Sequence, residues 1–381
     1  MLMLKKTIAA LSLLSILAAC QNDENPSQPE PKPRQDINLT RAEQEFMDKG
    51  TDFAFRFFDQ VCSTEKEKPN VFVSPLSASL CLSMITNGAT DNTLAEMQNV
   101  LGFPANTFSL DDLNNYNQKL TSALLDLDNT TQLGIANSIW IEEGFKVYDS
   151  FVDVNKKMYD AQVQELDFTS PTAKDVINQW CATQTNNCIK EVIQEIPADA
   201  RMYLINALYF KGIWKSQFDK SATGQDNFTN VDGSQQKVAM MNQTATFNYT
   251  QTDDFSIAEL PYGNEAFSMV ILLPSGDKTL DESLPSLNYE NWKQWSKNMV
   301  GKELQIKLPR FKVEYDKELE EDMIAMGMKD AFDAYKAKFA NMSGAELYIG
   351  LLQQFTYINV DEEGTEAAAV TVGGTVSYTH L

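Results

Sequence analysis

Near its C-terminal end the chain reads Glu362-Glu363-Gly364-Thr365-Glu366-Ala367-Ala368-Ala369-Val370-Thr371, and this stretch decides how the rest is interpreted. It follows Tyr357-Ile358-Asn359-Val360, an apolar run typical of a strand. Alternate positions from Thr365 to Thr375 carry only small, uncharged residues. Because side chains alternate between the two faces of a strand, this register can be buried without burying a charge, while Glu366 stays in solvent. The segment can therefore exist as an exposed loop or as an inserted strand.

Composition narrows the classes of function. The chain has 381 residues, 43% of them hydrophobic, which is enough for one large domain or two ordinary ones. Its net charge is −22, whereas nucleic-acid-binding proteins usually have a basic surface, so this class of function is not expected. The single histidine, His380, is next to the last residue, a poor place for the imidazole base of a Ser-His-Asp or Cys-His site, and the count excludes histidine-rich metal sites. We predict no cofactor, no metal and no nucleic-acid partner; a carboxylate-pair hydrolase stays open.

The N-terminus is predicted to be a targeting segment. Lys5 and Lys6 precede an apolar run over residues 8–19, which is too short to span a bilayer comfortably and fits a signal peptide. The run ends in Leu17-Ala18-Ala19-Cys20, which resembles the bacterial lipobox, where the cysteine is lipidated after cleavage. The alternative is an ordinary signal peptide with a chance cysteine. We therefore predict residues 1–19 to be a lipoprotein signal peptide and Cys20 to be the membrane anchor.

The region after Cys20 is predicted to be a tether. Residues 20–39 contain Pro26, Pro29, Pro31 and Pro33 among polar residues, a composition typical of a solvated, partly polyproline II segment. It would hold the domain at residues 40–381 away from the membrane. The acidic residues at positions 23 and 24 resemble the export tags of surface-exposed lipoproteins in some anaerobic Gram-negative bacteria. This predicts an outer-membrane lipoprotein, with its extracellular or periplasmic side left open.

Four further cysteines allow disulfides without requiring them. They are Cys62, Cys81, Cys181 and Cys188. Cys181 and Cys188 are seven residues apart, about 10 Å along a continuous helix, so they pair only if the helix ends between them. A large domain does not need a disulfide, and buried free thiols are the expected state.

Hydrophobic patterning predicts one mixed α and β domain. Thr40 and Glu43 form a capping-box pattern at the start of an amphipathic helix. Early helices give way to long strands, which indicates an α+β fold with large antiparallel sheets. Helices are expected over residues 76–85, 91–101, 149–159 and 319–328, and strands over 70–73, 133–141, 202–210, 267–273 and, with a break at Pro309, 305–313.

Several separate segments resemble the serpin family in the right order. The run from Asn70 to Ser77 resembles the family's strand-to-helix segment, and the run from Leu204 to Trp214 its third strand of the main sheet. The hinge quoted above resembles the start of the reactive loop. The resemblance implies a shutter formed by Ser74, Ser77 and Asn206, a breach containing Trp214, and Arg310 facing the hinge glutamate Glu362.

The resemblance also implies a fold, namely helices packed on three β-sheets, with a large central sheet and an exposed reactive loop. Two departures from the family pattern are visible. Gln354 aligns where the family commonly has a shutter histidine, so a pH-linked opening there is not expected. The chain also stops within the loop, so the last strands are expected to be missing, leaving core exposed and sheet edges unpaired. Because Ser377-Tyr378-Thr379-His380-Leu381 resembles adapter read-through, we hypothesise a truncated gene with non-native terminal residues.

An inhibitory serpin is a suicide substrate and not an enzyme, so the resemblance implies a covalent partner. A serine-type or cysteine-type endopeptidase would cleave the loop, and the freed hinge would enter the main sheet as an extra strand. Family spacing places the scissile bond between Tyr378 and Thr379. The expected protein is a monomeric protease inhibitor on the cell surface. The alternatives are a non-inhibitory serpin acting as a binding module or chaperone, and an unrelated surface hydrolase.

Overall fold

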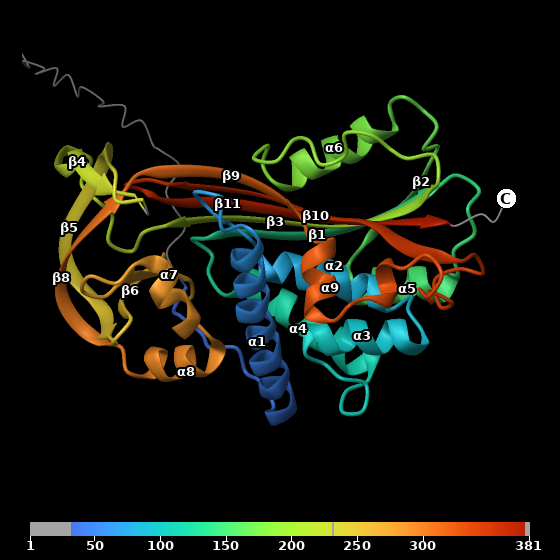
Figure 1. Cartoon of the computed structure of the whole chain (residues 1–381), viewed down its shortest axis with the longest axis horizontal. Coiled ribbons are helices and arrows are strands. Elements are labelled where there is room, and N and C mark those ends of the chain that lie inside the picture. The colour runs from blue at the N-terminus through green and yellow to red at the C-terminus, as the bar shows by residue number, and fades with distance from the viewer. Residues whose placement is uncertain (1–31, 231, 378–381) are drawn as a thin grey trace, which may run out of the picture.

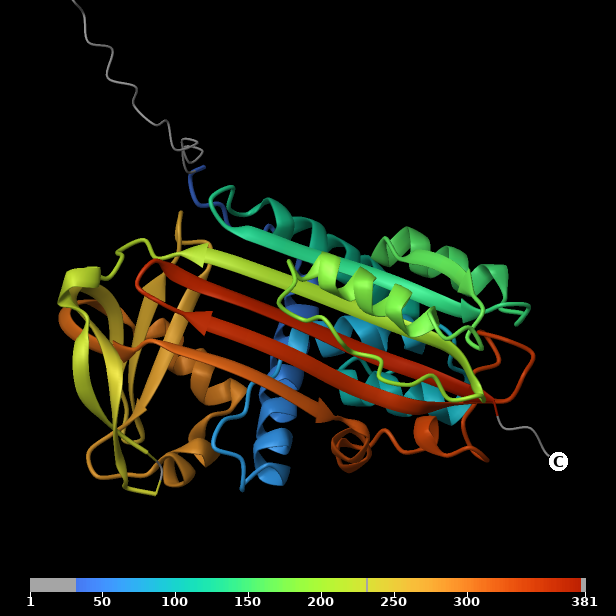
Figure 2. The same ribbon diagram turned by 90° about the horizontal axis from the view of Figure 1, so that it is seen from above.

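A computed structural model describes residues 32–230 and 232–377, and it has the expected α+β architecture. A long six-stranded sheet lies across the molecule, with most helices packed below it and α6 above it (Figures 1 and 2). The helices are α1 Arg41–Thr64, α2 Pro75–Thr86, α3 Asp91–Leu101, α4 Leu110–Asp126, α5 Asp149–Tyr159, α6 Ala173–Gln184, α7 Leu280–Ser283, α8 Tyr289–Lys297 and α9 Glu320–Met326, with 3₁₀ turns η1 Lys220–Ala222, η2 Leu284–Ser286 and η3 Asp330–Phe332.

The large sheet has the strand order β2-β1-β3-β11-β10-β9. Its strands are β1 Gln132–Glu142, β2 Gln162–Leu166, β3 Ala200–Ile213, β9 Phe311–Glu318, β10 Leu347–Val360 and β11 Gly364–Ser377. Every adjacent pair is antiparallel except β1 with β2, which is parallel. The three strands at the centre of the sheet therefore come from the middle and the end of the chain.

The reactive-loop segment is an inserted strand in this structure, which is one of the two states that its residue pattern allows, and not the exposed loop that the resemblance implied. β11 lies between β3 and β10 and is hydrogen-bonded in register to both. Both of its registers are covered: Thr371 and Gly373 face α2, while Ala368, Val370 and Val372 pack in the cluster that includes α6. The physical reason is that insertion completes a backbone ladder on both edges and removes apolar side chains from water.

A second sheet contains β4 Gly224–Thr229, β5 Gln235–Gln251, β6 Phe255–Pro261, β7 Ser268–Pro274 and β8 Val300–Pro309. β5 is long enough to pair with β4, β8 and β6 in succession along its length. In the described residues β5 is shared, since its first part pairs with β4 and β8 and its last residues pair with β6, so these strands are hydrogen-bonded as one continuous sheet. β7 is an edge strand among the described strands, and its Leu273 is 64% exposed.

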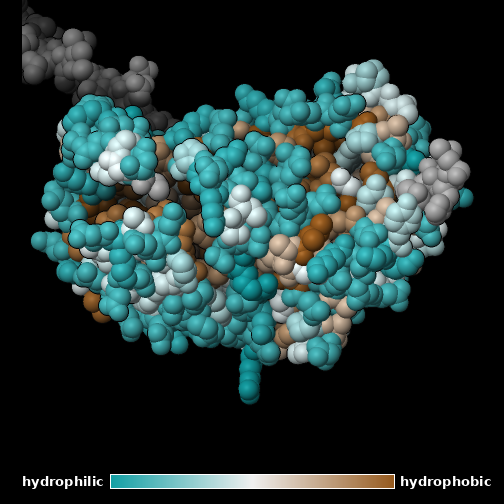
Figure 3. Space-filling model, viewed as in Figure 1, coloured by the Kyte–Doolittle hydropathy of each residue, from teal (hydrophilic) through white to brown (hydrophobic). Residues whose placement is uncertain are grey.

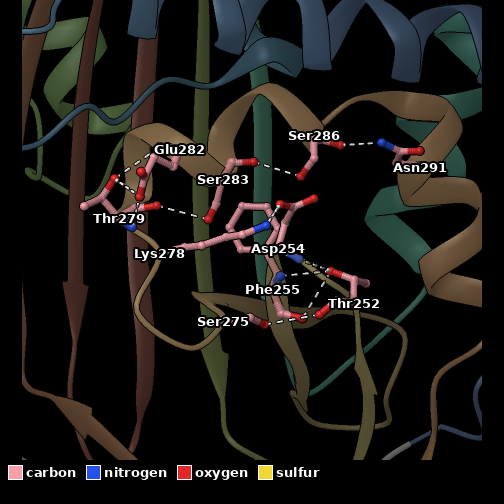
Figure 4. A network of polar contacts seen from close by, with 10 residues as sticks. All are labelled: Thr252, Asp254, Phe255, Ser275, Lys278, Thr279, Glu282, Ser283, Ser286 and Asn291. Carbon is pink, nitrogen blue, oxygen red and sulfur yellow. Dashed lines mark hydrogen bonds and ion pairs between the residues drawn. The ribbon is translucent and has the colours of Figure 1, made fainter.

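Local capping explains where several elements begin. The capping box of Thr40 and Glu43 is present at the start of α1, as predicted. Another capping box, Thr279 with Glu282, starts α7 within a polar network that also joins Lys278 to Asp254 at 2.7 Å (Figure 4). This network fixes the β6–β7 hairpin against the α7 region. No helix within the described ranges is both long and apolar enough to cross a membrane.

One predicted strand is wrong. Residues 70–73 are irregular because side chains of β10 take their backbone groups: Thr356 donates to the Phe72 carbonyl at 2.7 Å, and Gln354 accepts from the backbone N–H of Ser74. All four described cysteines are free thiols as predicted; Cys81 and Cys181 are also buried as predicted, whereas Cys62 and Cys188 are only partly buried. α6 ends between Cys181 and Cys188, and burial raises the pKa of the Cys81 and Cys181 thiols to about 12, so they are unreactive.

Candidate functional site: the hinge strand and its slot

The hinge begins at a buried carboxylate. The Glu362 side chain is 1% exposed, and both of its oxygens accept from Arg310 Nη2, at 2.5 and 2.6 Å. Thr223 Oγ1 donates to Glu362 at 2.7 Å. Burial alone would raise the pKa of Glu362, but the hydrogen bonds from Arg310 and Thr223 outweigh it and hold the pKa below its usual value. The structure therefore brings Arg310 and Glu362 together as an ion pair at the turn from β10 into β11.

Trp214 closes the same end of the slot. Its Nε1 donates to the Asp361 carbonyl at 2.8 Å, and its backbone N–H donates to the Glu363 carbonyl at 2.9 Å. The indole stacks on the Tyr262 ring with centroids 4.5 Å apart. Tyr262 in turn donates to Thr365 Oγ1 at 2.7 Å. The stacked rings of Trp214 and Tyr262 therefore hold the first residues of β11 in place by hydrogen bonds. No sequence motif indicated Tyr262 as a site residue.

Glu366 is the one charged residue in the body of β11. It is half-buried, and its Oε1 accepts from the Tyr209 hydroxyl at 2.6 Å and from Asn186 at 3.5 Å. Asn186 lies in the turn that ends α6, where its φ of 50° is left-handed. Glu366 was expected to stay in solvent, but it is half-buried and held by two partners that sequence patterning did not predict because they lie more than 150 residues away.

The predicted shutter residues surround the middle of β11. Gln354 donates to the Ser74 carbonyl at 3.0 Å and to Thr371 Oγ1 at 2.8 Å. Ser77 and Thr371 share a hydrogen bond between their hydroxyls at 2.8 Å. Gln354 thus makes the closing contacts that an amide can make in place of an imidazole.

Asn206 is a neighbour of this group without bonding to it. It lies opposite Thr371 in the β3–β11 register, but its Nδ2 donates to Asn137 on β1 at 2.9 Å. The buried Asn206 Oδ1 has no hydrogen-bond partner among the described residues. The structure therefore brings Ser74, Ser77, Gln354 and Thr371 into one network and leaves Asn206 in a second one beside it.

Two glycines are required by close approach. A Cβ atom on Gly364 would lie 2.0 Å from the Gly212 carbonyl oxygen, and one on Gly373 would lie 2.5 Å from Ile85 of α2. Neither contact can relax without moving the backbone or the core. The predicted scissile residues Tyr378 and Thr379, and the predicted lipidation site Cys20, lie outside the described residues. Among described side chains, no group of three metal-binding residues occurs.

Comparisons with known proteins identify the family of the chain. Residues 48–380 match the model of the family Serpin (serine protease inhibitor). An uncharacterised serpin-like protein of Methanosarcina acetivorans is 35% identical and is aligned over 84% of this chain and 76% of its own length. Serpin B6 of Macaca fascicularis is 36% identical over 79% of this chain and 82% of its own length.

Among solved structures, a thermophilic serpin, tengpin, in the latent state has a TM-score of 0.80 and 32% identity, covering 91% of this chain and 92% of that one. The large sheet, the buried hinge glutamate and the shutter contacts are thus found in a chain whose relatives are serpins. The chain belongs to the serpin family.

Proposed function

We propose that this serpin inhibits serine-type endopeptidases as a suicide substrate, by insertion of the cleaved reactive loop. The observation that carries the proposal is the fit of β11 in the central sheet. From Thr365 to Thr375 one face presents only small, uncharged side chains to the core, and the single charge in the body of the strand, Glu366, has a partner at the opposite face. A hinge with bulky or charged residues facing the core would resist this insertion.

Insertion supplies the driving force for inhibition. It forms roughly ten or more ladder hydrogen bonds, each contributing about 0.5–1.5 kcal/mol net. The total is comparable to the whole stability of an ordinary domain, on the order of 5–15 kcal/mol. A loop-exposed form is therefore metastable, and cleavage releases it. The relative crystallised in a latent state supports the proposal that the uncleaved strand can also insert.

The chemical step belongs to the protease. Its nucleophilic oxygen attacks the scissile carbonyl, the peptide C–N bond breaks, and the amine leaves with the proton that the protease's base supplies. An ester then joins the new C-terminus of the loop to the protease. Movement of β11 into the sheet would displace the protease before water hydrolyses this ester. We propose Tyr378–Thr379 as the scissile bond, which favours chymotrypsin-like targets.

The test is formation of the covalent complex. The loop-exposed form is incubated with a chymotrypsin-like protease, and the products are separated on denaturing gels and weighed by mass spectrometry. We expect an ester-linked complex, and none with a protease whose nucleophilic serine is replaced by alanine. Rapid, complete cleavage without any trapped complex across serine and cysteine endopeptidases would refute inhibition and favour the non-inhibitory alternative.

We further propose that Cys20 carries the lipid anchor of an outer-membrane lipoprotein. The support is the Leu17-Ala18-Ala19-Cys20 pattern after a short apolar run. Expressed in a Gram-negative host, the protein should fractionate with membranes and carry acyl chains on residue 20, whereas Cys20→Ser should be released. Equal membrane retention of the Cys20→Ser variant would refute lipidation at this residue.

A further inference from the structure

A cavity of about 370 Å³ lies on the α6 side of the large sheet, toward the end of β11. Its roof is the segment over residues 192–197, which joins α6 to β3, and its floor is formed by β10 and by the last residues of β11. Figure 3 shows apolar side chains lining the hollow between α6 and the sheet. The size suits a small organic ligand.

One tyrosine on the cavity wall has a buried ring and a hydroxyl without a hydrogen-bond partner among the described residues. Tyr203 lines the cavity and is 2% exposed, yet its hydroxyl makes no hydrogen bond to a described residue. Gly374 makes room for the ring, because a Cβ there would lie 2.9 Å from it. Burial raises the pKa of Tyr203 to about 12, so its hydroxyl stays protonated at neutral pH. An unpartnered hydroxyl beside an apolar wall is suited to a ligand that has a ring and a polar atom.

The ionised side chains that line the cavity are negatively charged. Glu195 and Glu318 line it, both are exposed, and neither forms a salt bridge with a described residue. None of the described residues that line the cavity is a lysine or an arginine, and the ring of Phe355 adds an aromatic surface. Two carboxylates beside aromatic rings favour a cation over an anion.

The cavity also depends on the state of the loop. Gly374 and Val376 of β11 form part of its floor, so this surface is complete only when β11 lies between β3 and β10. A ligand that needs this floor binds the inserted form better than the loop-exposed form, and it shifts the balance between them by that difference in affinity.

We propose that this cavity binds an aromatic amine, with its ammonium group at Glu195 and Glu318 and its ring against Tyr203 and Phe355, and that binding selects the inserted form. The binding site stands on the cavity alone. The preference for one state rests on the proposed function, since it requires a form in which the loop is outside the sheet.

Tryptamine is a suitable probe, and indole-3-propionate and indole-3-ethanol are its anionic and neutral counterparts. Calorimetric titration of the inserted form should show saturable tryptamine binding and no binding of indole-3-propionate at concentrations up to about 10 mM. Glu195→Gln with Glu318→Gln should weaken binding by about tenfold, since the ion pairs are lost. Tyr203→Phe should also weaken it, whereas Glu314→Gln, on the same strand outside the cavity, should leave it unchanged.

Equal binding of the anion, or undiminished tryptamine affinity in the double glutamine variant, would overturn the assignment of this cavity. The state preference has its own readout: tryptamine should raise the melting temperature of the inserted form and not that of the loop-exposed form. Equal shifts in both forms would overturn the preference. No step uses a protease, so failure of protease trapping and failure of amine binding are separate results.

Discussion

At the scale of single residues, Thr365 is the most sensitive position of the hinge. It is 6% exposed and hydrogen-bonded to Tyr262, which itself stacks on Trp214. Thr365→Arg would require a guanidinium to be buried in place of a small hydroxyl that bonds to Tyr262, at a cost of several kcal/mol. We expect the variant to be cleaved by its target protease as a substrate, with the yield of covalent complex on denaturing gels falling severalfold. Ser377→Arg, at the far end of β11, serves as the matched control, and equal yields from the two variants would contradict the prediction.

A second residue-scale prediction concerns pH and the Arg310–Glu362 pair. The folded pKa of Glu362 lies below its ordinary value of 4.5, so the pair contributes stability above that value, and the contribution is lost as pH falls through the folded pKa. In Arg310→Gln, burial remains and raises the pKa of Glu362. Because Arg310 is 49% exposed and solvent screens its charge, we expect the variant to lose about 1–3 kcal/mol of unfolding free energy at neutral pH.

Thermal melts of both proteins between about pH 3 and pH 7 provide the measurement. The melting temperature of Arg310→Gln should fall furthest below that of the parent protein at neutral pH, where an unpaired carboxylate is buried. The difference should shrink in acid as Glu362 is protonated. Lys220→Gln removes the neighbouring exposed pair with Glu363 and should leave the melts unchanged. A deficit that does not vary with pH would contradict the role given to the charge of Glu362.

At the scale of elements, the sequence predicted best where local pattern decides the structure. The capping box of α1, most helices and strands, and the alternation of small residues in β11 follow from spacing over a few residues. The pairing of Arg310 with Glu362 came from resemblance to a family. Sequence patterns could not predict four other side chains that form hydrogen bonds with the hinge, because the fold brings them there from distant parts of the chain and they belong to no local motif. They are Tyr209, Asn186, Tyr262 and Thr223. The predicted strand over residues 70–73 is wrong for the same reason. Side chains of the distant strand β10 bond to the backbone there, where a neighbouring strand would otherwise do so.

The edge of β7 is the element on which self-association should depend. Among the described strands β7 pairs with β6 alone, and Leu273 is 64% exposed at the end of an apolar run. Such an edge is a template for another chain. Leu273→Lys should reduce the fraction of oligomer measured by light scattering after mild heating, with little change in melting temperature. Leu125→Lys, at an exposed position of α4, is the control; equal oligomer formation by the two variants would locate self-association elsewhere.

At the scale of the whole molecule, the position of β11 determines thermal stability. As an inserted strand it is paired on both edges and covered on both faces, so a form with this segment outside the sheet lacks those contacts. A difference of about 5–15 kcal/mol, at about 2 °C per kcal/mol for a domain of this size, predicts a rise in melting temperature of about 10–30 °C after loop cleavage. Calorimetry before and after cleavage of the loop-exposed form measures it. Thr365→Arg should show a smaller rise, because its hinge enters the sheet incompletely. Unchanged melting temperatures on cleavage would mean that the loop does not insert, and that the protein acts through its surface as a binding module.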